Sequence, residues 1–199
     1  MPKSRLEAFS DGVMAIILTI MVLEMKVPHG DASLASLKPI LPVFLSYLLS
    51  FTYLGIYWNN HHHLLQAARK VNGKILWANL HLLFWLSLLP FVTGWMGENG
   101  FAAWPVLFYN AVLLLAGTAY YILSRQLVAH HGEDSALARA VGRDRKGLAS
   151  LGAYVLAVAL SFVNPWISVG ISVAVAVMWV IPDRRIESAL KESDGAQGG

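Results

Sequence analysis

Six long apolar segments run along this chain of 199 residues, and they constrain its fold more than any other feature. Each is about 17 residues or longer, the length that an α-helix needs to cross roughly 30 Å of hydrocarbon. The stretches between them carry residues that end helices, such as VPHGDAS after the first segment and GENG after the third. We therefore expect six transmembrane helices, near residues 5–26, 34–64, 75–96, 101–129, 147–163 and 165–181.

The composition agrees with a membrane protein. Hydrophobic residues make up 56% of the chain, charged residues make up 14%, and the mean hydropathy is +0.54. The predicted fold is therefore all-α: a polytopic membrane protein with one six-helix domain over residues 1–183. Residues 184–199 are expected to form a disordered cytoplasmic tail. The chain has no cysteine, which excludes disulfides, thiolate metal sites and cysteine catalysis.

The basic residues between the segments give the orientation in the membrane. With a cytoplasmic N-terminus, thirteen lysines and arginines fall on the cytoplasmic side, and only Lys26 and Lys38 fall outside. By the positive-inside rule, we expect both termini in the cytoplasm. The basic residues are spread over every cytoplasmic edge, which argues against nucleic-acid binding and suits contact with membrane lipids. The thirteen are Lys3, Arg5, Arg69, Lys70, Lys74, Arg125, Arg139, Arg143, Arg145, Lys146, Arg184, Arg185 and Lys191.

An aspartate, Asp11, lies about two turns into the first segment. A charged side chain near the bilayer centre costs at least about 2.5 to 3.5 kcal/mol, so such a group needs partners. Alternating helices bring Asp11 to the depth of polar side chains at the end of the second segment and the start of the third. We expect these side chains to tie the three helices together, with Asp11 as the buried carboxylate. They are Trp58, His61, Asn79 and His81.

Another side of the first segment is apolar. At 100° per residue, five side chains fall within an arc of about 100°, and Asp11 points roughly 140° away from Ile16. Such a stripe is open to two interpretations. It either contacts lipid or a neighbouring helix, or it forms the wall of a pore with a hydrophobic constriction and a threonine hydroxyl for a passing ion. The five residues are Gly12, Ile16, Thr19, Ile20 and Leu23.

Histidines occur in two runs, at 61–63 and 130–131. Consecutive helical residues point about 100° apart, so they do not share a metal ion as i, i+4 pairs do. The sequence also lacks a clustered nucleophile or metal-ligand set. We therefore expect no metal site, no cofactor and no enzymatic activity.

The stretch RLEAFSD at the start of the first segment carries a resemblance to a known family. It resembles the Arg-x-x-x-Phe-Ser-Asp signature that opens the endosomal/lysosomal potassium channel family (transmembrane protein 175). WNNH at the end of the second segment resembles that family's Trp-x-x-His, and NLHLLFWLSLLPF resembles its third helix. With the expected polar contacts, these motifs predict an intracellular network of Arg5, Phe9, Ser10, Asp11, Trp58, His61 and Asn79.

The resemblance implies both architecture and function. Four six-helix subunits would surround one pore, lined by the first helix, that conducts potassium ions passively and has no carbonyl selectivity filter. The family's constriction falls on Ile16, and its next apolar rings fall on Ile20 and Leu23. Its selectivity threonine falls on Thr19, whereas Ala15 stands where some relatives carry serine. The similarity to prokaryotic members implies a homotetramer in the plasma membrane.

A proton-coupled secondary transporter is the alternative, with Asp11 and His61 as a proton relay. That mechanism predicts an inverted repeat and helices interrupted at the midplane. The first segment has no glycine or proline between Val13 and Leu23, and the two three-helix halves are similar only in helix count. The sequence therefore favours a channel.

Overall fold

The computed structural model describes residues 3–28, 33–68, 70–132, 135, 137, 138, 142 and 144–180. Every regular element in these ranges is a helix, which confirms the all-α prediction. Residues 184–199, predicted to form a tail, lie outside the described ranges. The elements are α1 (Lys3–Leu23), the 3-10 helix η1 (Leu34–Ile40), α2 (Leu41–Ala67), α3 (Gly73–Ser87), α4 (Leu89–Glu98), α5 (Ala103–His131), α7 (Arg145–Leu160) and α8 (Pro165–Val180).

These elements make six rods in the predicted order, because η1 continues into α2 and α3 continues into α4. Four rods are long and apolar enough to cross a membrane: Lys3–Leu23, Leu34–Ala67, Gly73–Glu98 and Ala103–His131. The last two, α7 and α8, have 16 residues each, or about 24 Å of helix. The chain is therefore a polytopic helical membrane protein whose two C-terminal helices are shorter than the others.

Prolines lie where two of the rods change geometry. Pro90 has no N–H to donate to the carbonyl four residues earlier, which interrupts the helical ladder. The chain turns more tightly there, and the Leu88 N–H bonds the Trp85 carbonyl at 3.2 Å. The predicted helix 75–96 is consequently a broken rod. Pro39 likewise lies inside η1, directly before α2 begins.

Side chains cap two helix starts. Asn72 Oδ1 accepts a hydrogen bond from the Ile75 N–H at 3.0 Å, at the start of α3. Asp144 Oδ1 accepts one from the Gly147 N–H at 2.8 Å, at the start of α7. Asn and Asp are preferred at this position because they satisfy N–H groups that the helix itself leaves free. The capping residues therefore define where these two helices begin.

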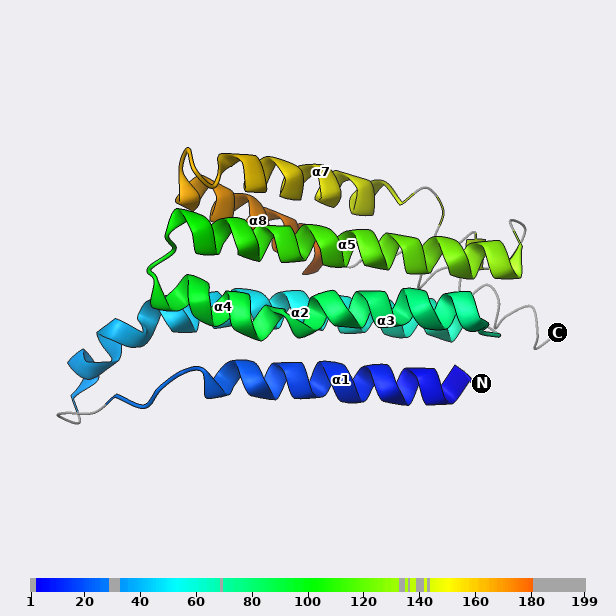
Figure 1. Cartoon of the computed structure of the whole chain (residues 1–199), viewed down its shortest axis with the longest axis horizontal. Helices are drawn as coiled ribbons and strands as arrows, with labels where there is room; N and C mark the ends of the chain where they lie inside the picture. The colour runs from blue at the N-terminus through cyan, green and yellow to red at the C-terminus, as the bar shows by residue number, and fades with distance from the viewer. Residues whose placement is uncertain are drawn as a thin grey trace.

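The rods lie side by side in layers. Figure 1 shows α1 along one edge of the molecule, followed by α2, α3 and α4, then α5, with α7 and α8 along the opposite edge. Helix α1 packs against α2, α3 and α4, whereas α5 packs against α3, α4, α7 and α8. An edge position leaves one long side of α1 facing away from the body of the chain.

The two ends of the bundle differ in how their helices are joined. At one end, Lys3 Nζ donates to the Leu65 carbonyl at 3.0 Å, and the Lys70 N–H donates to His131 Nε2 at 3.3 Å. This end carries the basic residues assigned to the cytoplasm by the positive-inside rule. At the opposite end, Lys26 Nζ and Glu98 Oε1 form an exposed ion pair at 3.3 Å. The ion pair joins the segment after α1 to the end of α4.

Buried polar side chains join helices within the core. Asn110 of α5 donates through Nδ2 to Ser168 Oγ of α8 at 3.0 Å, and Ser172 Oγ donates to Asn110 Oδ1. Tyr53 of α2 donates to the Ser172 carbonyl at 2.6 Å. Such bonds contribute about 0.6 to 2 kcal/mol each between membrane helices. They hold α8 in a fixed register against α2 and α5.

Candidate functional site

Helix α1 has one buried face. Its members recur every three or four residues, which places them on the same side of an α-helix. They face α2, α3 and α4, the elements against which α1 packs. Met14 and Met21 each expose only 1% of their surface, so this face of α1 is closely packed against the rest of the subunit. The buried residues are Leu6, Ser10, Met14, Ile17 and Met21.

The other face of α1 is exposed and carries the apolar stripe predicted from the sequence. Ile16, Ile20 and Leu23 expose 58%, 42% and 77% of their surface. Gly12 and Thr19 are exposed as well. All five residues of the stripe are therefore exposed, outside the face of α1 that packs on α2, α3 and α4.

A buried hydrogen-bonded chain connects α1 to α3 and α2. Asn79 of α3 donates through Nδ2 to Ser10 Oγ at 2.9 Å, and its Oδ1 lies 2.7 Å from His61 Nε2 of α2. Because the amide nitrogen faces Ser10, its oxygen faces the histidine, and this assignment makes His61 Nε2 the donor. Ser10 Oγ in turn donates to the Leu6 carbonyl at 2.8 Å. All three polar side chains are buried.

Asp11 occupies a different place from the one expected. The sequence interpretation put this carboxylate at the centre of the buried contacts, but Asp11 is exposed, Ser10 is the residue of α1 that contacts Asn79, and Asn79 is the central residue. Consecutive residues point about 100° apart on a helix, so only one of the two faces Asn79. Asp11 Oδ1 instead accepts from Trp58 Nε1 at 3.0 Å. The Trp58 ring stacks on His62 with centroids 6.0 Å apart, which orients the donor.

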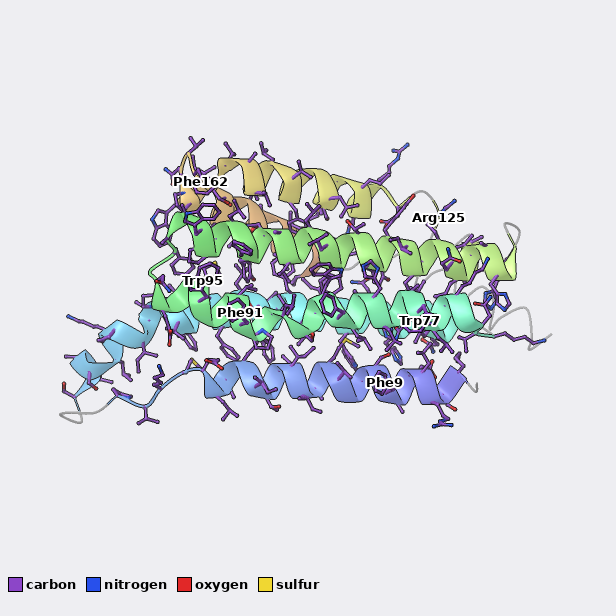
Figure 2. All side chains as sticks on the ribbon, viewed as in Figure 1. Phe9, Trp77, Phe91, Trp95, Arg125 and Phe162 are labelled. Carbon is purple, nitrogen blue, oxygen red and sulfur yellow. The ribbon has the colours of Figure 1, made fainter. Side chains whose placement is uncertain are left out.

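Three other predicted residues lie outside these contacts. Arg5 is exposed, and Phe9, labelled in Figure 2, exposes 53% of its surface. His81 accepts a hydrogen bond from Trp85 Nε1 at 2.9 Å and is exposed on α3, where it does not join the buried chain. Figure 2 also labels Trp77 on α3, which exposes 75% of its surface.

Comparison with known proteins identifies the family. The sequence profile described as endosomal/lysosomal potassium channel TMEM175 matches residues 5–90. A potassium channel of Chryseobacterium sp. (strain P1-3) is 56% identical over 193 residues, covering 97% of this chain and 100% of that one. The chain belongs to the TMEM175 family. The resemblance found in the motifs of the first three segments is thereby confirmed.

Two further comparisons extend the TMEM175 match over most of the chain. A potassium channel of Chamaesiphon minutus is 30% identical over 196 residues, covering 89% of this chain and 93% of that one. The crystal structure of a TMEM175 homologue from the same organism, described as a lysosomal potassium-selective channel, superposes with a TM-score of 0.78 at 29% identity. It covers 90% of this chain and 96% of the other. The six-helix arrangement is therefore the fold of TMEM175 channels.

TMEM175 proteins are ion channels, so this chain is a channel protein and not an enzyme. Among the residues that the structure describes, no group of three or more histidine, cysteine or acidic side chains could hold a metal ion. The two members of the alternative proton relay have different partners, since Asp11 bonds Trp58 and His61 bonds Asn79. Within the described ranges of this TMEM175 chain, no hydrogen bond joins Asp11 to His61.

Proposed function

We propose that four copies of this chain form a potassium-permeable channel whose pore is lined by α1. The observation that carries the proposal is the exposed apolar stripe of α1, opposite the face that packs on the chain. Fourfold symmetry about a central axis turns this same face of every copy toward the axis. The relatives described as potassium channels support potassium as the permeant ion.

Ile16 is proposed as the narrowest ring. It exposes 58% of its surface at the middle of the stripe, so four copies would present four branched apolar side chains at one level. An apolar constriction of this kind opposes ions by excluding water, because the ion must shed hydration without gaining new ligands. Ile20 and Leu23, one and two turns further along, would form the next rings.

Thr19 supplies the polar layer beyond the Ile16 ring. Its hydroxyl donates to the carbonyls of Ala15 at 3.2 Å and Ile16 at 2.9 Å. With the hydrogen directed into the helix, the oxygen lone pairs point away from it and can accept from water or face a cation. Four such oxygens would favour a weakly hydrated cation, and potassium holds its water less tightly than sodium. Thr19 is therefore the proposed selectivity residue.

This path has no carbonyl selectivity filter. Helix α1 is continuous from Lys3 to Leu23, and the carbonyls of a continuous helix accept the helix's own N–H groups. Conduction along α1 must therefore depend on side chains. The stripe offers Thr19 as its single hydroxyl, between the rings of Ile16 and Ile20.

The polar contacts at the cytoplasmic end have a positioning role. The chain Ser10–Asn79–His61 fixes α1 against α3 and α2, and Trp58 holds Asp11 beside it. Because Ser10 lies on the buried face and Ile16 on the exposed face, this anchor sets which side of α1 faces the axis. The anchor therefore sets which residues the pore presents to ions.

The channel is proposed to lie in the plasma membrane of a prokaryote, surrounded by lipid. Its membrane domain covers residues 1–183, with 184–199 as a cytoplasmic tail. The basic residues of the cytoplasmic end, among them Lys70, Arg125 and Lys146, would meet anionic headgroups.

Ion flux in proteoliposomes tests the function. The purified protein is reconstituted with an outward gradient of potassium, of sodium or of protons, and the flux of each ion is followed separately. We expect the potassium gradient to drive potassium flux without any proton gradient. This potassium flux should be larger than the sodium flux driven by an equal sodium gradient. Potassium movement that requires an opposing or accompanying proton gradient would contradict the channel and support the transporter. Equal flux of both metal ions would contradict potassium preference.

Subunit count tests the assembly. Native mass spectrometry in detergent and chemical crosslinking in the vesicles are expected to give a tetramer. A monomer that still conducts would overturn the pore formed by four copies of α1, because a single α1 cannot enclose a path.

A further inference from the structure

A pocket lies between α2, α5, α7 and α8, on the side of the bundle opposite α1. Figure 1 shows α7 and α8 along one edge and α1 along the other. The pocket is therefore separate from the proposed pore. Six of its thirteen lining residues are aromatic, and these six come from all four helices. The aromatic residues are Tyr53, Tyr57, Tyr120, Tyr121, Tyr154 and Trp179.

The tyrosine hydroxyls of this pocket differ in their hydrogen bonds. Tyr53 donates to the Ser172 carbonyl at 2.6 Å, and Tyr120 donates to the Asn60 carbonyl at 3.2 Å. The hydroxyl of Tyr57 makes no hydrogen bond to the described part of the chain, although this residue exposes only 8% of its surface. The Tyr57 hydroxyl is therefore free to bond a molecule that enters the pocket.

The charged groups near the pocket already have partners. The carboxylate of Asp144, which lines the pocket, caps α7 by accepting from the Gly147 N–H at 2.8 Å. Lys146 Nζ lies 3.5 Å from the Met178 carbonyl and 6.0 Å from the centroid of the Trp179 ring. A charged ligand would have to leave water without gaining a free counter-charge. The site therefore favours a neutral ligand.

We propose that this pocket binds a small neutral aromatic amphiphile of the alkylphenol type. Its ring would pack against the tyrosines in the offset or edge-to-face geometry that aromatic rings prefer. Its single hydroxyl would bond the hydroxyl of Tyr57. Its alkyl group would lie along the apolar wall formed by Ile56 and Leu151.

The pocket is adjacent to the contacts that hold α1. Tyr57 and Trp58 are consecutive residues of α2: one lines the pocket, and the other donates to Asp11 of α1 at 3.0 Å. A ligand that displaces this turn of α2 would alter the distance between Trp58 Nε1 and Asp11 Oδ1. If the proposed pore is correct, ligand binding therefore alters ion flux. The binding itself does not depend on the pore and is measured separately.

Gly117 gives a direct way to fill the pocket. A methyl group at this position would lie 3.6 Å from the Tyr57 hydroxyl and 3.1 Å from Leu151 Cδ2, the movable end of a side chain. The matched control is Gly152 of α7, where an added methyl would meet nothing within 4 Å. Both changes are glycine to alanine within a helix, so they differ mainly in the space they occupy.

Photolabelling tests the binding. A diazirine-bearing propylphenol is added to proteoliposomes of phosphatidylcholine, and labelled peptides are mapped by mass spectrometry. We expect labels on the α5 and α7 segments that line the pocket, removed by excess unlabelled propylphenol. Gly117→Ala should reduce this labelling about fivefold or more because overpacking costs 1 kcal/mol or more. Gly152→Ala should leave it unchanged.

A second variant separates the hydrogen bond from the space. Tyr57→Phe keeps the ring and removes the hydroxyl, so binding should weaken about three- to tenfold. Equal labelling in wild type, Gly117→Ala and Tyr57→Phe would overturn the proposal. Labelling of the pocket by a phospholipid probe that propylphenol does not displace would do so too, since the occupant would then be an acyl chain. Propylphenol that binds without changing flux would contradict only the coupling to α1.

Discussion

The two faces of α1 differ in what they contact. On one face, Met14 and Met21 are almost completely covered by α2, α3 and α4, and Ser10 adds a buried polar link. On the other, Ile16 and Leu23 expose more than half of their surface, at 58% and 77%. Both faces are apolar, so hydrophobicity does not distinguish them. The buried face is distinguished by close packing and by a hydrogen bond, which fix α1 within its own subunit.

Substitutions on the buried side are therefore expected to lower stability, and those on the exposed side to change conduction. Asn79→Leu should have the largest effect. It leaves the buried His61 Nε2 without its partner, at about 1 to 3 kcal/mol, whereas Ser10 keeps its bond to the Leu6 carbonyl. The midpoint of thermal unfolding in detergent should fall clearly. Asn59→Leu, at an exposed position of the same cytoplasmic end, is the control and should stay near wild type.

A matched pair on α1 compares the faces directly. Met14→Ala opens a cavity on the buried face and should cost about 1 to 3 kcal/mol, less than in a water-soluble core because lipid is as apolar as the protein interior. Ile16→Ala removes a similar amount of side chain from the exposed face and should cost under about 0.5 kcal/mol. Unfolding of the detergent-solubilised subunit measures both. Equal losses would mean that Ile16 packs within the subunit.

Ile16→Asn tests the proposed constriction. A polar amide at the narrowest ring should let water enter, so the barrier for ions falls and basal flux rises about tenfold or more, equivalent to about 1.4 kcal/mol. Discrimination between potassium and sodium should weaken, because a wider hydrated path lets both keep more water. Single-channel recording in planar bilayers measures both quantities. Unchanged conductance would place the constriction elsewhere.

Thr19→Val should have the smallest effect. It removes the hydroxyl and keeps the branched shape, so the Ile16 ring and the packing of α1 are preserved. We expect potassium preference over sodium to fall about two- to fivefold, which corresponds to under about 1 kcal/mol. The shift in reversal potential under mixed gradients measures it. Thr118→Val on α5, whose hydroxyl donates to the Leu114 carbonyl at 2.8 Å, is the control.

Much of this arrangement could be predicted from the sequence because it depends on periodicity. Segment length gives the rods, and 100° per residue places Ile16 and Leu23 on one side and Asp11 on another. The same arithmetic leaves the choice between Ser10 and Asp11 open, because it gives angles between residues of one helix but not the direction in which that helix faces its neighbours. The structure shows that Ser10, and not Asp11, faces α3 and bonds Asn79.

Other features depend on tertiary packing that the sequence does not specify. The break at Leu88 depends on whether Pro90 bends a helix or ends it, which neighbouring helices determine. The tyrosine pocket brings together α2, α5, α7 and α8, and no local pattern reveals that Tyr57 and Gly117 face one another. Contacts between distant segments require the tertiary packing to be known.

The ion pair between Lys26 and Glu98 gives α1 unequal attachments at its two ends. Toward its N-terminus, α1 is secured by buried hydrogen bonds, which dissolved ions do not reach. At its other end the polar link is an ion pair whose side chains are 84% and 49% exposed, and exposed pairs of this kind contribute little and weaken as salt is added. The polar links at the two ends of α1 therefore differ in their dependence on salt: added electrolyte weakens the Lys26–Glu98 pair and leaves the buried Ser10–Asn79 bond intact.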